Sequence, residues 1–77
     1  MTAELFKKRT KYLALRCGEF VDELPIRKSL DIYGRQLIRS SSSVGANYRA
    51  VCRAKSQADM INKLKIVEEE ADETLYW

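Results

Sequence analysis

The chain has 77 residues, with 14 lysine or arginine, 11 aspartate or glutamate and no histidine. This length allows one small domain, which is marginally stable unless disulfides, a metal or oligomerisation supplement its core. The lack of histidine argues against a His-based general base or triad and, with only two cysteines, against a structural zinc site. No stretch approaches the roughly 20 apolar residues of a membrane span.

The two cysteines and the start of the chain bear on stability and location. Cys17 and Cys52 lie in separate helical patterns, so we expect two buried free thiols and no disulfide framework. Oligomerisation then remains as the expected supplement to the core. The first ten residues, MTAELFKKRT, are charged and have no apolar segment of the kind found in a secretory signal. Free thiols without such a signal predict a cytoplasmic protein that has no membrane partner.

The first predicted helix covers residues 3–23. Thr2 is a plausible N-cap, and Leu24-Pro25 ends the helix because the residue before proline avoids the helical region. The apolar residues recur near the helical period: Leu5, Tyr12, Leu13, Cys17, Phe20, Val21 and Leu24.

The second predicted helix begins between Pro25 and Ser29 and continues to about Ala54. Propensity and periodicity disagree over residues 40–45, because the sequence SSSSVG is typical of a loop. The apolar residues before and after the serines are in phase, which favours one continuous helix. Small residues recur every four positions on it: Ser42, Ala46, Ala50 and Ala54. Two readings are open: these residues allow close approach of another helix, or they are simply tolerated at a surface.

The third predicted helix begins at Ser56, with Asp59 as the acidic member of a capping box. The short turn at Lys55-Ser56 implies that the second and third helices are antiparallel neighbours. The sequence ends on Tyr76-Trp77 within the apolar stripe. The expected fold is therefore all-α, an antiparallel up-and-down bundle in one domain over residues 1–77, with the first three helices of a four-helix bundle present and the fourth absent.

Charge is distributed unevenly. Residues 1–55 carry 12 basic and 5 acidic residues, a net charge of +7, whereas residues 56–77 carry 2 and 6, a net charge of −4. On the second helix, four arginines fall within about 80° of each other: Arg35, Arg39, Arg49 and Arg53. A second basic group lies near the start of the first helix: Lys7, Lys8, Arg9 and Lys11.

These eight residues are the candidate contacts to the phosphates of RNA or DNA. A solvated face, or ion pairs with the acidic third helix of a neighbouring subunit, would explain the arginines equally well. The aromatic residues do not interleave with the arginine stripe, so base stacking is not indicated.

The acidic run at residues 68–73 does not predict a metal site, since di-iron bundles pair glutamate with Glu-x-x-His motifs. Glu68 nevertheless falls inside the apolar stripe of the third helix, where an unpaired buried carboxylate is costly. We therefore expect this carboxylate to be ion-paired, hydrogen-bonded or at a wet rim, with Arg39 and Asn47 of the second helix as the candidate partners. No residue pattern indicates catalysis, a cofactor or a small-molecule substrate.

Two blocks of sequence, QLIRS followed by SVGANYRA at residues 36–50 and INKLKIVEEEADETLYW at residues 61–77, carry a family resemblance. They resemble the bacterial four helix bundle protein family, also called the large-subunit ribosomal RNA intervening-sequence protein family. With the weaker pattern of the first helix, the resemblance covers nearly the whole chain.

The resemblance implies a left-turning antiparallel four-helix bundle, often assembled as a homopentamer, in which a fourth helix follows the Tyr-Trp pair. A related protein, the accessory variability protein of diversity-generating retroelements, is a basic pentamer that works with a reverse transcriptase and nucleic acid. Only Arg39, Arg49 and Arg53 match positions that are commonly basic in the family.

These observations together predict a non-enzymatic, oligomeric helical-bundle scaffold or adaptor that binds RNA or DNA through basic helix faces. The alternative is a purely structural or protein-interaction module, whose arginines form ion pairs between subunits.

Overall fold

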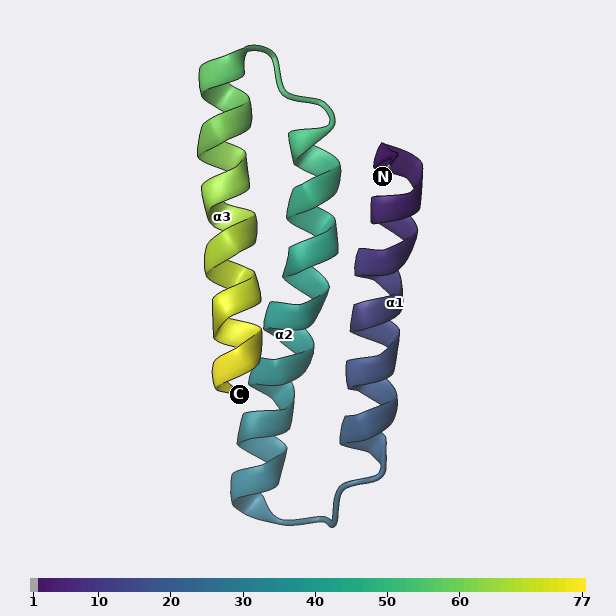
Figure 1. Ribbon diagram of the computed structural model, residues 1–77. Helices are drawn as coiled ribbons and strands as arrows, with labels where there is room; N and C mark the ends of the chain where they lie inside the picture. Colours follow the sequence, from purple (N-terminus) through teal and green to yellow (C-terminus); the bar gives the residue numbers. More distant parts are fainter. Residues whose placement is uncertain (1) are drawn as a thin grey trace.

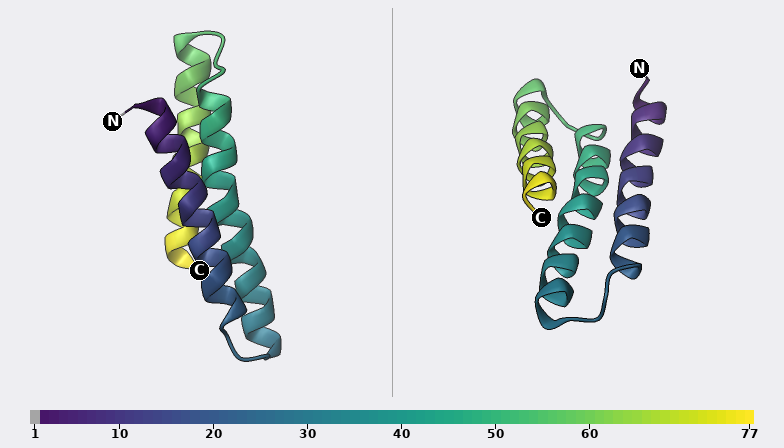
Figure 2. Two further views of the ribbon diagram at one scale, coloured as in Figure 1. Left: turned by 90° about the vertical axis from the view of Figure 1, so that its right-hand side faces the viewer. Right: turned by 60° about the horizontal axis from the view of Figure 1, so that its bottom comes forward.

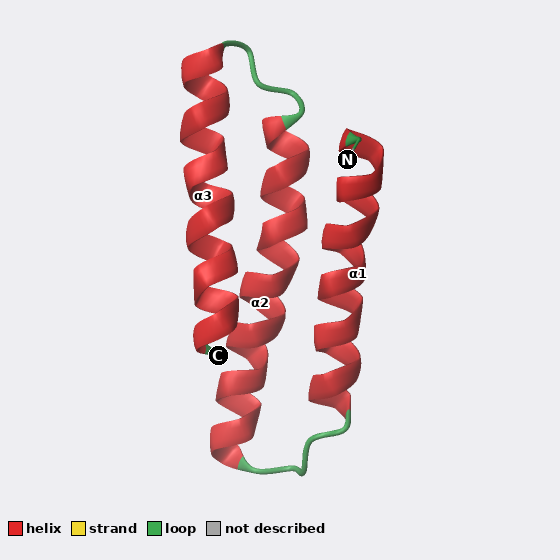
Figure 3. Cartoon of the chain, in the orientation of Figure 1, coloured by secondary structure: helices red, strands yellow, loops and turns green. Residues whose placement is uncertain are grey.

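The computed structural model describes residues 2–77 and shows an all-helical chain, with no strand in that range. Its three helices are α1 (Ala3–Asp22), α2 (Lys28–Val51) and α3 (Gln57–Tyr76), joined by two loops (Figures 1 and 3). The predicted all-α class and the three helices are confirmed. The second helix ends at Val51 and not at Ala54, so the link to α3 comprises residues 52–56 instead of the expected two-residue turn.

Side-chain caps start α1 and α3 where the sequence predicts them. The Thr2 hydroxyl accepts a hydrogen bond from the Leu5 amide at 3.1 Å, and the Ser56 hydroxyl accepts one from the Asp59 amide at 3.1 Å. Each bond satisfies one of the amides that have no partner inside the helix. The Asp59 carboxylate accepts a hydrogen bond at 3.0 Å from the amide of Lys55, the residue before the cap. This bond fixes the end of the loop to the first turn of α3.

The serine run lies inside α2, as the periodicity predicts. Ser40 and Ser41 are fully buried, and their hydroxyls donate to the carbonyls of Leu37 and Ile38, each at 3.3 Å. A hydroxyl that bonds to the preceding turn needs no partner outside the helix. Serine therefore serves here as a small, satisfied residue, which overrides its preference for loops.

The second helix lies between the other two. It packs against both α1 and α3, whereas no Cα atom of α1 lies within 8 Å of a Cα atom of α3 (Figures 1 and 2). The three helices thus form a layer, with Cα extents of 45 × 21 × 14 Å. The left view of Figure 2 shows α1 and α3 displaced toward the same side of α2. Such a layer leaves two broad faces of α2 without a covering helix.

Small residues of α2 set the distance to each neighbour. A Cβ atom on Gly45 would lie 3.1 Å from the Thr10 hydroxyl of α1, and one on Gly34 would lie 3.0 Å from a methyl group of Val21. On the α3 side, the Thr74 hydroxyl donates to the Ser40 hydroxyl at 3.1 Å. Helices approach closely where their side chains are small.

The small residues that the sequence analysis singled out have a different position. Ser42 and Ala46 are exposed, while Ala50 and Ala54 are only half-buried. Periodicity identifies a stripe of small residues correctly, but the stripe that carries the helix contacts lies on another side of α2, because the direction of α1 and α3 is a tertiary property.

An ion-paired cluster joins α2 to α3. Arg39 bridges Glu73 and, at 3.2 Å, Glu70. The Trp77 indole also donates to the Glu73 carboxylate, at 3.3 Å, and its ring stacks on Tyr33 with 5.8 Å between centroids. The hydrogen bond from Arg39, followed by that from Trp77, lowers the pKa of Glu73 below its ordinary value of 4.5, against the opposing effect of partial burial.

The hydrophobic core is small. Val44 and Val51 are the buried apolar side chains longer than alanine among residues 2–77, with 5% and 8% of their surface exposed. The expectation of two buried thiols is wrong for Cys52, which is exposed in the turn after α2, whereas Cys17 is half-buried; both are free. The core is limited because a single layer cannot enclose the apolar stripes of its helices.

We predict that glycine at position 45, but not at position 18, is required by packing. A Cβ on Gly18 meets no atom within 4 Å, so Gly18→Ala should raise the free energy of unfolding by about 1 kcal/mol through helix propensity alone. Gly45→Ala should raise the free energy of unfolding by less than Gly18→Ala does, because its methyl group lies against Thr10. Gly45→Leu should lower the free energy of unfolding, because its larger side chain cannot fit beside Thr10. Urea unfolding followed by circular dichroism measures all three. Equal stabilisation by Gly18→Ala and Gly45→Leu would contradict the α1–α2 contact.

We also predict a loss of stability in acid that depends on Arg39. Because the pKa of Glu73 is lower in the folded chain than its ordinary value of 4.5, its contribution is complete above that pH and is lost as the pH falls through the folded-state pKa. Thermal unfolding between pH 7 and pH 2 should show a smaller acid-dependent drop in Arg39→Met than in the parent chain.

Arg35→Met is the matched control, because Arg35 pairs with Asp31 of the same helix at 2.9 Å and crosses to no other element. It should leave the acid-dependent drop close to that of the parent. The pKa of Asp59 is also lowered, by Lys63 and by the Lys55 amide, so Asp59 contributes to the acid-dependent drop in stability that remains in both variants. An unchanged drop in Arg39→Met would show that the α2–α3 ion pairs are absent in solution.

Candidate nucleic-acid interface

A basic groove runs between α1 and α2. Its hollow has a volume of about 620 Å³ and is lined by residues of both helices: Lys7, Thr10, Lys11, Ala14 and Leu15 from α1, with Ser42, Gly45, Ala46 and Arg49 from α2. A second hollow continues it along α1; it shares Lys7, Lys11, Leu15 and Arg49 and adds Glu4, Lys8 and Tyr12. These four cations, Lys7, Lys8, Lys11 and Arg49, define the basic groove.

The groove exists because its floor consists of small residues. Gly45 brings α1 and α2 together at Thr10, and Ser42 and Ala46 beside it are too short to fill the space above that contact. Lys7 and Lys11 are one helical turn apart, about 6 Å along the axis of α1. Arg49 faces them from α2. The floor is neutral, and the rim carries four cations against one carboxylate, that of Glu4, so its net positive charge attracts anionic groups.

Cations of the groove are mostly free of internal partners. Lys7 pairs with Glu4 at 3.3 Å, and the Glu4 side chain is largely exposed, so water screens this pair. Within residues 2–77, Lys8, Lys11 and Arg49 have no ion pair within 4 Å. Their charge is therefore available to an anionic partner.

The predicted arginine stripe is divided by the structure. Arg49 lies in the groove, whereas Arg35 pairs with Asp31, and Arg39 is occupied by Glu70 and Glu73. Arg53 follows the end of α2 and lies exposed in the turn. The four side chains thus do not form one continuous surface, because two of them neutralise carboxylates and one is outside the helix.

Of the first-helix cluster, three lysines reach the groove and Arg9 does not. Arg9 is exposed and lies two positions from Lys7 and Lys11 on either side, which turns it toward the opposite face of α1.

Glu68 and Asn47 do not meet. Glu68 is exposed, and its carboxylate has no hydrogen bond or ion pair within residues 2–77. The Asn47 amide donates to the Ser43 carbonyl at 2.8 Å, one turn back on its own helix. The expected pairing of Glu68 with Arg39 or Asn47 is therefore not present in the single chain, because Arg39 reaches the side of α3 that carries Glu70 and Glu73.

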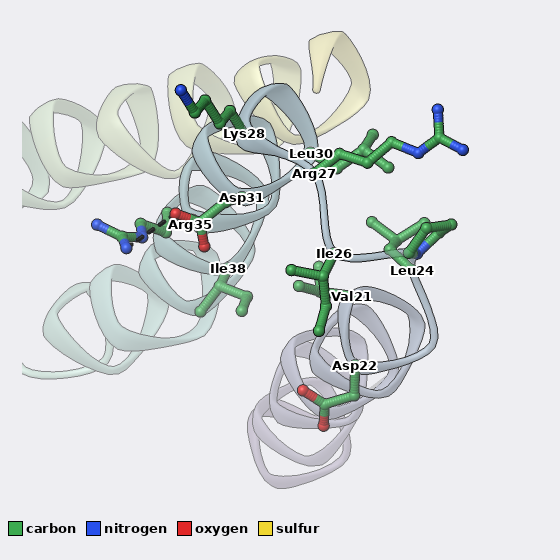
Figure 4. A pocket seen from close by; sticks show the side chains of 11 residues that line it. Val21, Asp22, Leu24, Ile26, Arg27, Lys28, Leu30, Asp31, Arg35 and Ile38 are labelled. Atoms are coloured by element: carbon green, nitrogen blue, oxygen red, sulfur yellow. Dashed lines mark ion pairs between the residues drawn. The ribbon is translucent and has the colours of Figure 1, made fainter.

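Another hollow lies under the α1–α2 loop. Figure 4 shows the apolar side chains of Val21, Ile26 and Ile38 around it, with Lys28 extending outward and Arg35 held by Asp31. Ile26 is fully exposed. Cations and carboxylates border this hollow in similar number, whereas the basic groove has four cations and one carboxylate, Glu4.

The groove residues that the sequence analysis did not assign to a binding surface are the neutral ones: Thr10, Ala14, Leu15, Ser42, Gly45 and Ala46. Spacing alone could have found part of this set, since Lys7, Thr10, Lys11 and Ala14 follow the three- and four-residue period of one helix face. Their juxtaposition with Arg49 depends on the register between α1 and α2, which the period of either helix does not contain.

Two further observations concern the described part of the chain. Between Thr2 and Trp77, no three His, Cys, Asp or Glu side chains gather as a metal-ligating group. Over the same residues, none of the helices has the combination of length and apolar character that crossing a bilayer requires.

Comparisons with known proteins add no relative. No family model, no curated protein and no solved structure matches this chain.

Proposed function

We propose that this chain is a non-enzymatic helical scaffold that assembles as an oligomer and holds RNA or DNA by its phosphates. The basic groove is the observation that carries the proposal, because it gathers Lys7, Lys8, Lys11 and Arg49 around one hollow. Lysine and arginine that release counterions from a phosphate backbone supply most of the affinity of sequence-independent binding.

The oligomeric part of the proposal is supported by the small core and the open layer. Large apolar side chains remain exposed on all three helices, and monomeric domains of this size seldom tolerate that. We propose that further helices close the layer into an up-and-down bundle. The family resemblance in residues 36–50 and 61–77 agrees with such a bundle and with a homo-oligomer.

A purely structural role is the second candidate, and the state of Arg39 favours it. This arginine bridges Glu70 and Glu73 within the chain, so its role is to fasten α3 to α2. If Arg49 has a similar carboxylate partner in an assembly, the basic groove is a protein contact and not a nucleic-acid site.

We predict weak, salt-dependent binding of nucleic acid. A generic RNA and a generic duplex DNA should bind with a dissociation constant of about 10⁻⁴–10⁻⁶ M at physiological salt. The double variant Lys11→Gln/Arg49→Gln should bind more weakly, and the slope of log affinity against log salt should decrease in magnitude by about 2, since two phosphate contacts are lost. Fluorescence anisotropy over a salt series measures both quantities.

The control is Lys28→Gln/Lys65→Gln, which removes the same charge from exposed positions away from the groove. It should change the slope much less than the groove variant. Equal effects of the two variants would mean that net charge alone attracts the nucleic acid. No binding at low salt would sink the nucleic-acid proposal and leave the structural role.

A further inference from the structure

An exposed aromatic ring lies among the cations of the first helix. Tyr12 has 60% of its surface exposed and lines the second of the two hollows that form the basic groove. Lys8 lies one turn before it on α1 and Arg16 one turn after it, so the three side chains share one side of the helix. No aromatic residue interleaves with the arginine stripe of α2, but this one interleaves with the cations of α1.

The Tyr12 ring has no packing role that explains its place. The guanidinium carbon of Arg16 lies 5.9 Å from the ring centroid, a contact that is weak at an exposed site. Phe6, by comparison, packs edge-on against Tyr48 of α2 with 4.5 Å between centroids, and so joins two helices. Tyr12 takes part in no aromatic pair of this kind, and its ring is mostly accessible from solvent.

The cations beside Tyr12 have a spacing that suits a strand of nucleic acid. Lys7 and Lys11 are about 6 Å apart along the axis of α1, close to the distance between consecutive phosphates of an extended strand. Lys8 and Tyr12 have the same separation, one residue further along. A strand that follows α1 therefore places one base at the ring while the phosphates on either side of it reach lysines.

The acidic residue of the groove lies at one end of it. Glu4 is the carboxylate that lines the second hollow, and its oxygen is 3.3 Å from the Lys7 ammonium. Further along the rim, Lys8, Lys11 and Arg49 have no ion pair with residues 2–77. The uncompensated positive charge is thus on the part of the groove that holds Tyr12.

We infer that the ligand of the basic groove is a single strand of nucleic acid, with one base stacked on Tyr12, and not a duplex. The inference rests on the proposed function and narrows it. The bases of a duplex are paired and stacked inside it, so its phosphates reach the rim but no base reaches the ring. An unpaired base can stack, and such stacking tolerates any sequence because every base has a π face.

Charge alone favours the opposite choice. A duplex has the higher density of phosphates, and each phosphate contact to it contributes more to the salt dependence of binding than a contact to a single strand does. A preference for the single strand therefore has to come from the bases. A cationic track beside an aromatic platform is the combination that proteins use to bind single strands without sequence preference.

The site is separate from the apolar side of the layer. Arg49 is about 140° from Val44 around α2, so the groove and the Val44 side of the layer face in different directions. A further helix that packs on the Val44 side does not fill the groove. The inference consequently holds for the three helices alone and for a closed bundle.

The test compares one labelled strand of about 12 nucleotides, within the site sizes of single-strand binders, with the same strand annealed to its complement. Fluorescence anisotropy over a salt series gives both dissociation constants. The single strand should bind about tenfold more tightly than the duplex, as one stacked base provides. The strand is made as DNA and as RNA, which shows the sugar that the groove prefers, and the preference over the duplex should hold for both.

Variants of Tyr12 test the stacking. Tyr12→Ala should raise the dissociation constant of the single strand about tenfold and leave that of the duplex unchanged. The slope of log affinity against log salt should remain that of the parent, because no cation is lost. Tyr12→Phe keeps the ring and should bind as the parent does.

Tyr76→Ala is the matched control, because Tyr76 is 79% exposed on α3 and lines neither hollow of the groove. It should leave both dissociation constants unchanged. Circular dichroism should show the same helix content in all three variants, since each change is at an exposed side chain.

Two results would overturn the inference and leave the proposed function standing. One is a duplex that binds as tightly as the single strand, and the other is a preference for the single strand that Tyr12→Ala leaves intact. In both cases Lys11→Gln/Arg49→Gln still weakens binding, as phosphate contacts in the groove require. Absence of binding by either form at low salt overturns the proposed function, and the inference with it.

Discussion

The close approach of α1 and α3 to α2 is the constraint on which the rest of the structure depends. Both outer helices pack against α2 and neither packs against the other. The closest approaches on α2 involve glycine and serine, at Gly34, Gly45 and Ser40. Two aromatic pairs also pack across the helix contacts: Phe6 with Tyr48, and Tyr33 with Trp77. Most of the large apolar residues nevertheless remain outside the contacts and point to the faces of the layer.

This geometry places basic and apolar side chains on different faces of the layer. The α1–α2 contact at Gly45 leaves a hollow on one face, and Lys11 and Arg49 surround it. The other face keeps Val44 at its centre and exposes Leu64 and Phe20 on its flanks. The basic side chains of the groove and the exposed apolar side chains thus lie on opposite sides of one thin layer.

Arginine has two different roles in this molecule. Arg39 holds α3 in place through Glu70 and Glu73, and the same contact lowers the pKa of Glu73. Arg49 has no carboxylate within 4 Å among residues 2–77 and faces the groove. The two side chains belong to one stripe on the helical wheel. Their roles diverge because α3 covers only one edge of that stripe.

The sequence by itself determined the elements. Apolar periodicity, the caps at Thr2 and Ser56 and the stop before Pro25 are local properties, since each involves residues within about one turn of the other. The same periodicity kept the serine run inside α2. It also identified the lysines near the start of α1 as a cluster, because neighbours on a helix face are neighbours in the sequence.

Only the tertiary structure decided which side of each helix meets another helix. That choice paired Arg39 with carboxylates, brought Arg49 to the lysines of α1 and left Glu68 exposed, with no partner among residues 2–77. The physical reason is that the relative rotation and register of two helices depend on the fit of residues far apart in the sequence, such as Gly45 with Thr10 and Ser40 with Thr74, and the period of one helix carries no information about its neighbour.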